Sequence, residues 1–138
     1  MRVIVAFLKA VVICAVLYLG LAFASIYFFI STLPVRRASY DFLWHCHFHD
    51  WSNANALLSQ KMNSSFGPQL RQEWATVEQT RGEIVKWSDK GVRFGFDPLP
   101  VATISYSLQG KKPGTAYANF TLRRESGGWR IKQLKFQP

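Results

Sequence analysis

Acidic residues and cysteines are scarce in this sequence. It contains 8 Asp and Glu against 17 Lys and Arg, and 2 cysteines. All the acids lie after residue 33, together with every basic residue except Arg2 and Lys9, so that part of the chain carries a net charge of +7. The cysteines exclude an internal disulfide framework, because Cys14 lies in an uncharged apolar run and Cys46 lies outside it. We expect Cys46 to be buried as a small apolar residue.

Charge is absent from residues 10–33, which read "AVVICAVLYLGLAFASIYFFISTL" and are followed by Pro34. A bilayer core requires a helix of about 20 apolar residues, so this run predicts a transmembrane helix. A cleaved signal peptide is the alternative, because "AFAS" at residues 22–25 has the small-x-small form of a cleavage site. The apolar stretch continues through "IYFFI" beyond that point, whereas a signal core spans about 7–15 residues. We therefore favour an uncleaved anchor.

The charges that flank the run are nearly balanced, with Arg2 and Lys9 before it and Arg36 and Arg37 after it. The positive-inside rule therefore does not decide the orientation. A short tail before a long C-terminal domain is typical of a signal-anchor that exports the domain. We predict a single-pass protein of the cell inner (cytoplasmic) membrane with a periplasmic domain. The predicted segments are a short N-terminal tail at 1–9, a transmembrane helix at 10–33, a linker at 34–39 and a folded domain at 40–138.

Apolar residues recur at spacings of three and four at the start of the domain. This period predicts a helix over about 37–49, a short turn at 50–51 and a second helical segment over 52–59. The aromatic side chains expected to face a sheet are Trp44, Phe48 and Trp51.

The stretch "KMNSSFGPQL" that follows is rich in turn-forming residues and predicts a loop. Ser65 or Gly67 is expected to cap the next segment, with Pro68 in its first turn. Helical spacing of apolar residues then predicts a helix over about 68–80.

After Gly82 the period of apolar residues changes to two, which predicts four or five strands. Turn residues at "SDKG", "GKKPG" and "ESGG" predict three antiparallel hairpin connections. A bulge near Gln133 would place the apolar residues of the last strand on one side. Helices that precede strands predict the α+β class, with the helices packed on one face of a curved antiparallel sheet. Such a sheet forms a cone, and its mouth is a ready pocket.

Three segments of the domain resemble the NTF2-like (cystatin-like) superfamily. They are "HDWSNANALLS", "LRQEWATVEQTRGEIVKW" and, most specifically, "FTLRRESGGWRIKQLKF" with its Gly-Gly turn before the closing strand. The order and spacing of these segments are similar to those of uncharacterised bacterial branches of the superfamily. A second resemblance, in role rather than in fold, is to single-helix assembly factors of cytochrome oxidase.

The resemblance implies a domain that is either catalytic or purely a binding module. Enzymes of the superfamily use carboxylates or a His–Asp pair inside the cone, and here no acid is expected on the apolar face of a strand. Asp89, Asp97 and Glu125 are expected in turns or at strand ends. We therefore expect no enzymatic activity, no catalytic residues and no cofactor. The residues that could line the cone, or simply fill the core, are Trp74, Trp87, Phe94, Phe96, Tyr106, Phe120 and Trp129.

All three histidines lie in "WHCHFHDW", residues 44–51. On a helix His45 and His49 share a face, since they are four residues apart, while His47 points elsewhere. Two such ligands suit zinc or haem geometrically, but further ligands would have to come from other segments. We therefore predict no metal site and regard His45 and His49 as the pair to test.

The predicted function is that of a non-enzymatic membrane accessory protein. Its domain would bind a larger integral membrane protein complex as a subunit or assembly factor. The basic charge indicates attraction to anionic lipid or to an acidic protein surface, and no nucleic-acid partner is expected. The alternative is a membrane-tethered domain that binds a small molecule in its cone, or acts there as an isomerase or dehydratase.

Overall fold

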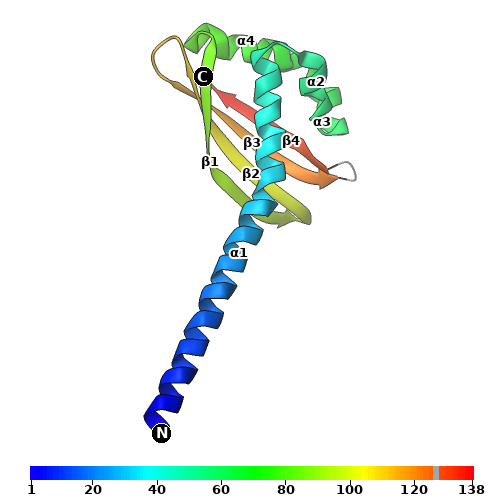
Figure 1. Cartoon of the computed structure of the whole chain (residues 1–138). Coiled ribbons are helices and arrows are strands. Elements are labelled where there is room, and N and C mark those ends of the chain that lie inside the picture. The colour runs from blue at the N-terminus through cyan, green and yellow to red at the C-terminus, as the bar shows by residue number, and fades with distance from the viewer. Residues whose placement is uncertain (126–127) are drawn as a thin grey trace. The chain divides into compact units, whose positions relative to one another are not determined.

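The computed structural model describes residues 1–125 and 128–138, with side chains for all of these except 28–30 and 97. The chain divides into two compact units, Met1–Leu33 and Pro34–Pro138. The helices are α1 (Arg2–His47), α2 (Trp51–Ala56), α3 (Gln60–Ser65) and α4 (Leu70–Arg81), with a short 3-10 helix, η1 (Gly67–Gln69), before α4 (Figure 1). The strands are β1 (Ile84–Asp97), β2 (Leu99–Gly110), β3 (Thr115–Glu125) and β4 (Gly128–Gln137).

The first unit, Met1–Leu33, is the N-terminal part of α1, and its only charged side chains are Arg2 and Lys9. Every residue from Met1 to Tyr27 except Ala22 is exposed, so this part of the helix has no buried face. By length and composition, α1 is long and apolar enough to cross a membrane, a test that a signal sequence also passes.

Pro34 lies inside α1, and residues 34–39, which were expected to be a linker, are helical. A proline removes one backbone N–H from a helix and crowds the preceding turn. The turns that follow Pro34 are stabilised by packing, because Val35 and Ser39 are fully buried in the second unit.

The buried face of α1 differs from the predicted one. Val35, Ser39, Phe42 and Cys46 follow one another at spacings of three and four, and all have 0% exposure. Trp44 and Phe48, predicted to face the sheet, are 47% and 60% exposed, so that prediction is wrong. The helix therefore buries Phe42 against the sheet and leaves the rings of Trp44 and Phe48 at the surface.

Two side chains cap the short helices after α1. Asp50 caps α2 by accepting the backbone N–H of Asn53, and Ser59 caps α3 by accepting that of Met62 at 3.2 Å. The loop predicted after Ser59 is therefore wrong, because residues 60–65 form α3, whose Met62 is buried in the core.

The helix predicted over 68–80 is confirmed as η1 followed by α4. The predicted caps are wrong, since Ser65 ends α3 and no side chain caps α4 at Gln69. Pro68 does lie in the first turn, within η1.

The sheet is an antiparallel meander in the order β1-β2-β3-β4, so β1 and β4 are its edges. The turn predicted at "SDKG" is instead a register shift inside β1, between Asp89 and Val92, where Gly91 has a φ of +102°. The first hairpin turn comes later, at Pro98. The turn at "GKKPG" is confirmed between β2 and β3, while the centre of "ESGG", residues 126–127, lies outside the described residues.

The predicted bulge in the last strand is confirmed. Leu122 pairs with Ile131 and Thr121 with Gln133, which leaves Lys132 as the extra residue of β4. As a result Ile131 and Phe136 are both buried although they have opposite parity along the strand. Residues 57–59 cover the outer edge of β4, since the backbone N–H of Ser59 donates to the carbonyl of Ile131 at 2.8 Å and that of Ile131 donates to Leu57 at 2.9 Å.

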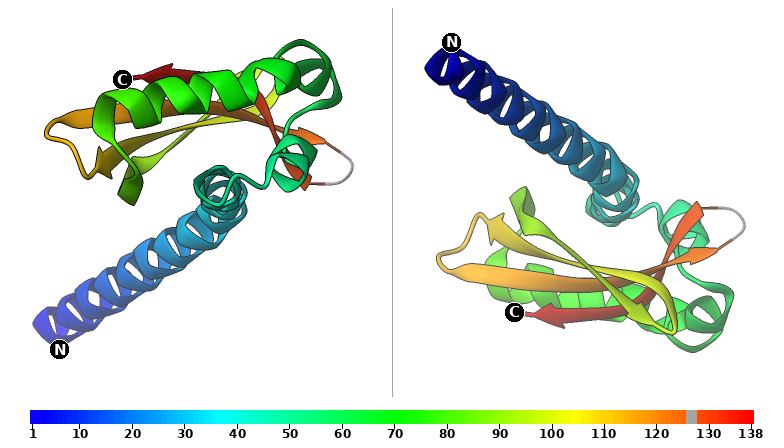
Figure 2. Two further views of the ribbon diagram at one scale, coloured as in Figure 1. Left: turned by 90° about the horizontal axis from the view of Figure 1, so that it is seen from above. Right: turned by 90° about the horizontal axis from the view of Figure 1, so that it is seen from below.

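Helices α1 and α4 pack on one face of the sheet. Phe42 of α1 meets Phe120 edge-on at a ring-centroid distance of 5.7 Å, and Trp74 of α4 meets Phe136 at the same distance. The view from above shows α4 lying over the sheet (Figure 2). The α+β class, with helices before a curved four-stranded antiparallel sheet, is therefore confirmed.

Candidate functional site

The histidine-rich stretch is the end of α1 and the turn after it. The helix stops at His47, and His49 has a φ of +56°, a left-handed conformation that is uncommon for residues other than glycine. His49 therefore leaves the helix, and the expectation that His45 and His49 share a helix face is wrong. His45 Nδ1 lies 3.6 Å from Asp50 Oδ2, whereas His49 Nε2 lies 2.9 Å from Glu78 Oε1. Among residues 1–125 and 128–138, no group of three or more His, Cys, Asp or Glu side chains is arranged to hold a metal ion.

His49 and Glu78 border a shallow hollow of about 310 Å³ between α4 and the start of α2. The indole N–H of Trp74 donates to the same Glu78 oxygen that contacts His49, which fixes the carboxylate. The imidazole of His49 stacks on the indole of Trp51 with a 25° interplanar angle. The guanidinium of Arg71 also lies over the Trp51 ring, 5.8 Å from its centroid. Because His49 and Trp74 both contact Glu78, the arrangement fastens the turn to α4.

The two thiols differ in environment. Both cysteines are free, with Cys46 buried and Cys14 exposed in the apolar part of α1. Burial raises the pKa of the Cys46 thiol, and the nearby Glu78 charge adds to the effect. A thiol that stays protonated is a poor nucleophile, so Cys46 serves the core rather than chemistry.

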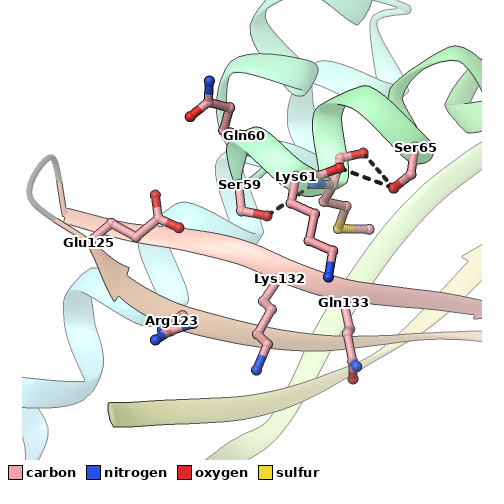
Figure 3. Close-up of a pocket in the computed structure, with 9 residues that line it drawn as sticks. Ser59, Gln60, Lys61, Ser65, Arg123, Glu125, Lys132 and Gln133 are labelled. Atoms are coloured by element: carbon pink, nitrogen blue, oxygen red, sulfur yellow. Dashed lines mark hydrogen bonds between the residues drawn. The ribbon is translucent and has the colours of Figure 1, made fainter.

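A second hollow borders α3 and the outer face of the sheet, with a volume of about 760 Å³ (Figure 3). Its charged side chains are three cations, Lys61, Arg123 and Lys132, and one carboxylate, Glu125. The hydroxyl of Ser59 accepts a backbone N–H of α3, and that of Ser65 donates to α3 carbonyls. Such a hollow attracts an anionic group but presents no activated nucleophile.

The inner face of the sheet is filled by side chains. Trp74, Tyr106, Phe42 and Phe120 are the largest of the fully buried residues and occupy the space between the helices and the strands. The seven aromatic residues expected to line a cone do not meet in one place. Trp74, Tyr106 and Phe120 are buried, Trp87 and Trp129 are half-buried, and Phe94 and Phe96 are exposed.

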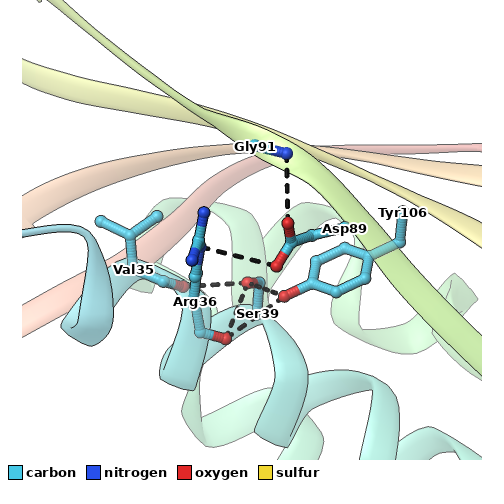
Figure 4. A network of polar contacts seen from close by, with 6 residues as sticks. All are labelled: Val35, Arg36, Ser39, Asp89, Gly91 and Tyr106. Carbon is cyan, nitrogen blue, oxygen red and sulfur yellow. Dashed lines mark hydrogen bonds and ion pairs between the residues drawn. The ribbon is translucent and has the colours of Figure 1, made fainter. Parts of the chain in front are cut away.

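One carboxylate does lie on the inner face, contrary to expectation. Asp89 pairs in register with Tyr106, whose side chain points inward, and its carboxylate lies 3.5 Å from Arg36 Nε (Figure 4). The backbone N–H of Gly91 donates to the other carboxylate oxygen at 3.1 Å. Asp89 was expected in a turn or at a strand end, but it lies inside β1, directly before the register shift.

A buried polar pair continues this network. The hydroxyls of Ser39 and Tyr106 lie 2.8 Å apart, and Ser39 also donates to the carbonyl of Val35 at 2.9 Å. Burial raises the pKa of Tyr106 to about 12, so the phenol is neutral at ordinary pH. Together the ion pair of Arg36 with Asp89 and the hydroxyl pair fix α1 to β1 and β2.

An exposed aromatic surface forms where α1 passes the beginning of β1. We call it the aromatic ridge, and it consists of Tyr40, Trp44, His47, Phe48, Val85 and Trp87. The rings contact one another: Trp44 lies 4.8 Å from Phe48, and Trp87 lies 5.5 Å from Tyr40 and 5.7 Å from His47, measured between centroids. A hollow of about 240 Å³ lies among them.

The aromatic ridge has the properties of an interaction surface. Its exposed fractions are 60% for Phe48, 56% for Val85, 47% for Trp44 and 45% for Tyr40. The indole N–H of Trp87 is buried and has no hydrogen-bond acceptor among the residues that the structure describes. Contiguous apolar surface of this kind marks binding sites, and Trp and Tyr are enriched among the residues that dominate binding energy.

Sequence reasoning missed the aromatic ridge because it assigned Trp44 and Phe48 to the core. The signal that identifies the inner face is the series Val35, Ser39, Phe42 and Cys46, which also recurs at helical spacing. Comparison of the chain with protein-family models, with curated proteins and with solved structures finds no match in any of the three.

Proposed function

We propose that this chain is a non-enzymatic, single-pass membrane accessory protein whose folded unit binds a larger integral membrane protein complex, as a subunit or assembly factor. The aromatic ridge is the observation that carries this proposal. The folded unit buries Trp74 and Phe42 almost completely, yet the side chains of Trp44 and Phe48 are 47% and 60% exposed. Exposed rings of this size are costly unless a partner covers them.

The apolar part of α1 supports a partner that is itself a membrane protein. Residues 10–33 carry no charge, and the folded unit follows them directly in the sequence, from Pro34. We propose that the folded unit is of the NTF2-like type. The order of helices before a curved four-stranded sheet supports this type, as do the sequence segments that resemble it.

The packing of the inner face supports a binding module rather than the alternative of a small-molecule site or an isomerase or dehydratase. Those activities need an open cone with a free acid or base inside it. In this unit Tyr106 and Phe120 fill that space, and the inner-face carboxylate of Asp89 is paired with Arg36.

Site-specific photo-cross-linking in intact cells tests the proposal. A benzoylphenylalanine at position 44 should cross-link to one integral membrane protein that also co-purifies with the wild-type chain in mild detergent. The same residue at position 109, which is exposed on β2, is the control and should not cross-link. Trp44→Ser with Phe48→Ser should abolish co-purification without unfolding the chain. Recovery of the wild-type chain only as a free monomer contradicts the proposal.

The proposed orientation has its own test. We propose that the folded unit lies on the periplasmic side of the cell inner membrane. Alkaline phosphatase, which is active only outside the cytoplasm, should be active when fused after Pro138. An inactive fusion that is made in full length would place the folded unit on the cytoplasmic side.

A further inference from the structure

The turn between β1 and β2 exposes apolar side chains at its tip. Phe96 is 82% exposed, Leu99 is 47% exposed, and Phe94, two residues back along β1, is 42% exposed. Pro98 and Pro100 lie in the same turn and are also exposed. The two prolines remove two backbone N–H donors from the tip, which lowers the cost of moving it out of water.

Three arginines lie on the strands at this end of the sheet. Gly95, Val101 and Arg123 form one row across three strands, so the end of β3 lies at the same end of the sheet as the turn between β1 and β2. Arg93 precedes that row, and Arg124 follows it. Two acidic residues, Asp97 at the end of β1 and Glu125 at the end of β3, lie at the same end of the sheet and leave the three arginines a net charge of +1 there. We define the tip surface as Phe94, Phe96, Leu99, Arg93, Arg123 and Arg124.

The tip surface lies at the end of the folded unit where the unit begins. His47 contacts Trp87 at 5.7 Å between rings, whereas Arg36 contacts Asp89 at 3.5 Å, so α1 runs antiparallel to β1. The C-terminal end of β1, which carries the tip, therefore lies toward the Pro34 end of the part of α1 that belongs to the folded unit. The uncharged run ends directly before Pro34 in the sequence.

We propose that the tip surface inserts into the headgroup region of a bilayer rich in anionic lipid. The inference rests on the proposed function, because the membrane concerned is the one that residues 10–33 would cross. Aromatic and leucine side chains then enter the boundary between headgroups and acyl chains, and the arginines bind lipid phosphates. Lipid is favoured over a protein partner because three apolar side chains offer far less than the roughly 800 Å² that each partner buries in a stable protein interface.

The test uses the full chain, one copy per lipid nanodisc, with a single environment-sensitive fluorophore attached to a cysteine. The label is placed in turn on Cys14, on Phe96→Cys and on Gln109→Cys, with the other native cysteines replaced by alanine. Gln109 is exposed at the opposite end of β2 and is the control. Quenching by nitroxide-labelled lipid is then measured in discs of phosphatidylglycerol and of phosphatidylcholine.

We expect strong quenching at positions 14 and 96 and little at 109. Quenching at 96 should fall in phosphatidylcholine discs, and in the variant Arg93→Gln with Arg124→Gln, but not in the charge-matched variant Lys111→Gln with Lys112→Gln at the opposite turn. If the label at position 14 is quenched but the label at position 96 is quenched no more than the control at 109, the tip does not insert, and the transmembrane anchor is still supported. Absence of quenching at 14 overturns the anchor and the tip insertion together.

Discussion

Two aromatic residues that lie two positions apart on α1 should respond in opposite ways to truncation. Phe42 is fully buried, while Trp44 is 47% exposed, and a helix turns by about 100° per residue, so the two side chains point about 200° apart. Phe42→Ala removes an edge-on contact with Phe120, and core Phe→Ala substitutions cost about 3–5 kcal/mol. That is a large part of the roughly 5–15 kcal/mol by which a domain is stable.

Trp44→Ala should cost less than about 1.5 kcal/mol although tryptophan is the larger residue, because half of its surface stays in water in the folded unit. Its ring partners, Phe48 and Trp87, are themselves in contact with solvent. The same variant should lose the membrane partner, which Phe42→Ala loses only to the extent that it unfolds.

The measurement is urea unfolding of the full chain in a constant concentration of detergent, followed by tryptophan fluorescence. All five tryptophans lie after residue 33, so the signal reports the folded unit alone. The free energy of unfolding should fall strongly for Phe42→Ala and little for Trp44→Ala, with an unchanged dependence on denaturant. A larger loss for Trp44→Ala would refute the assignment of the buried face of α1, and with it the aromatic ridge.

Burial raises the pKa of Tyr106 from 10.0 to about 12, so the free energy of unfolding should be level below pH of about 10 and fall as the pH rises toward about 12. In urea unfolding experiments, the free energy of unfolding of Tyr106→Phe should fall less steeply than that of the wild type over this pH range. Cys46 should resist alkylation in the folded chain and react quickly in urea, because burial holds its thiol protonated; equal rates would contradict its burial. Gly110→Ala should lower the midpoint of thermal unfolding much more than Gly95→Ala, since a Cβ at 110 would overlap the backbone carbonyl of Arg81, whereas one at 95 meets only the Val101 side chain at 3.8 Å. Similar midpoints would refute the close approach of β2 to the end of α4.

The sequence alone predicts the elements whose period is strong. The period of two after Gly82 predicts the strands, and the change of parity in β4 predicts the bulge now found at Lys132. Helix α4 follows from the spacing of Leu70, Trp74 and Val77, all of which are buried. These features depend on local alternation of apolar and polar residues, which a single sequence contains in full.

Features that depend on tertiary packing were not predictable in the same way. The residues "SDKG" favour a turn locally, yet β1 continues through them because pairing with β2 resumes at Val92. Residues 60–65 favour a loop, yet the cap at Ser59 and the burial of Met62 make them helical. The aromatic ridge was missed because size and apolarity do not distinguish a buried aromatic residue from an exposed one.

The two edges of the sheet are protected by different means. Residues 57–59 cover β4 with backbone hydrogen bonds, whereas β1 pairs on one side only and carries Lys86, Lys90 and Arg93 beside its register shift. An uninterrupted edge strand would offer its backbone groups to the same strand of another copy. Charge and irregularity in β1 oppose that pairing, so crowded copies of the chain resist polymerising into a continuous β-sheet.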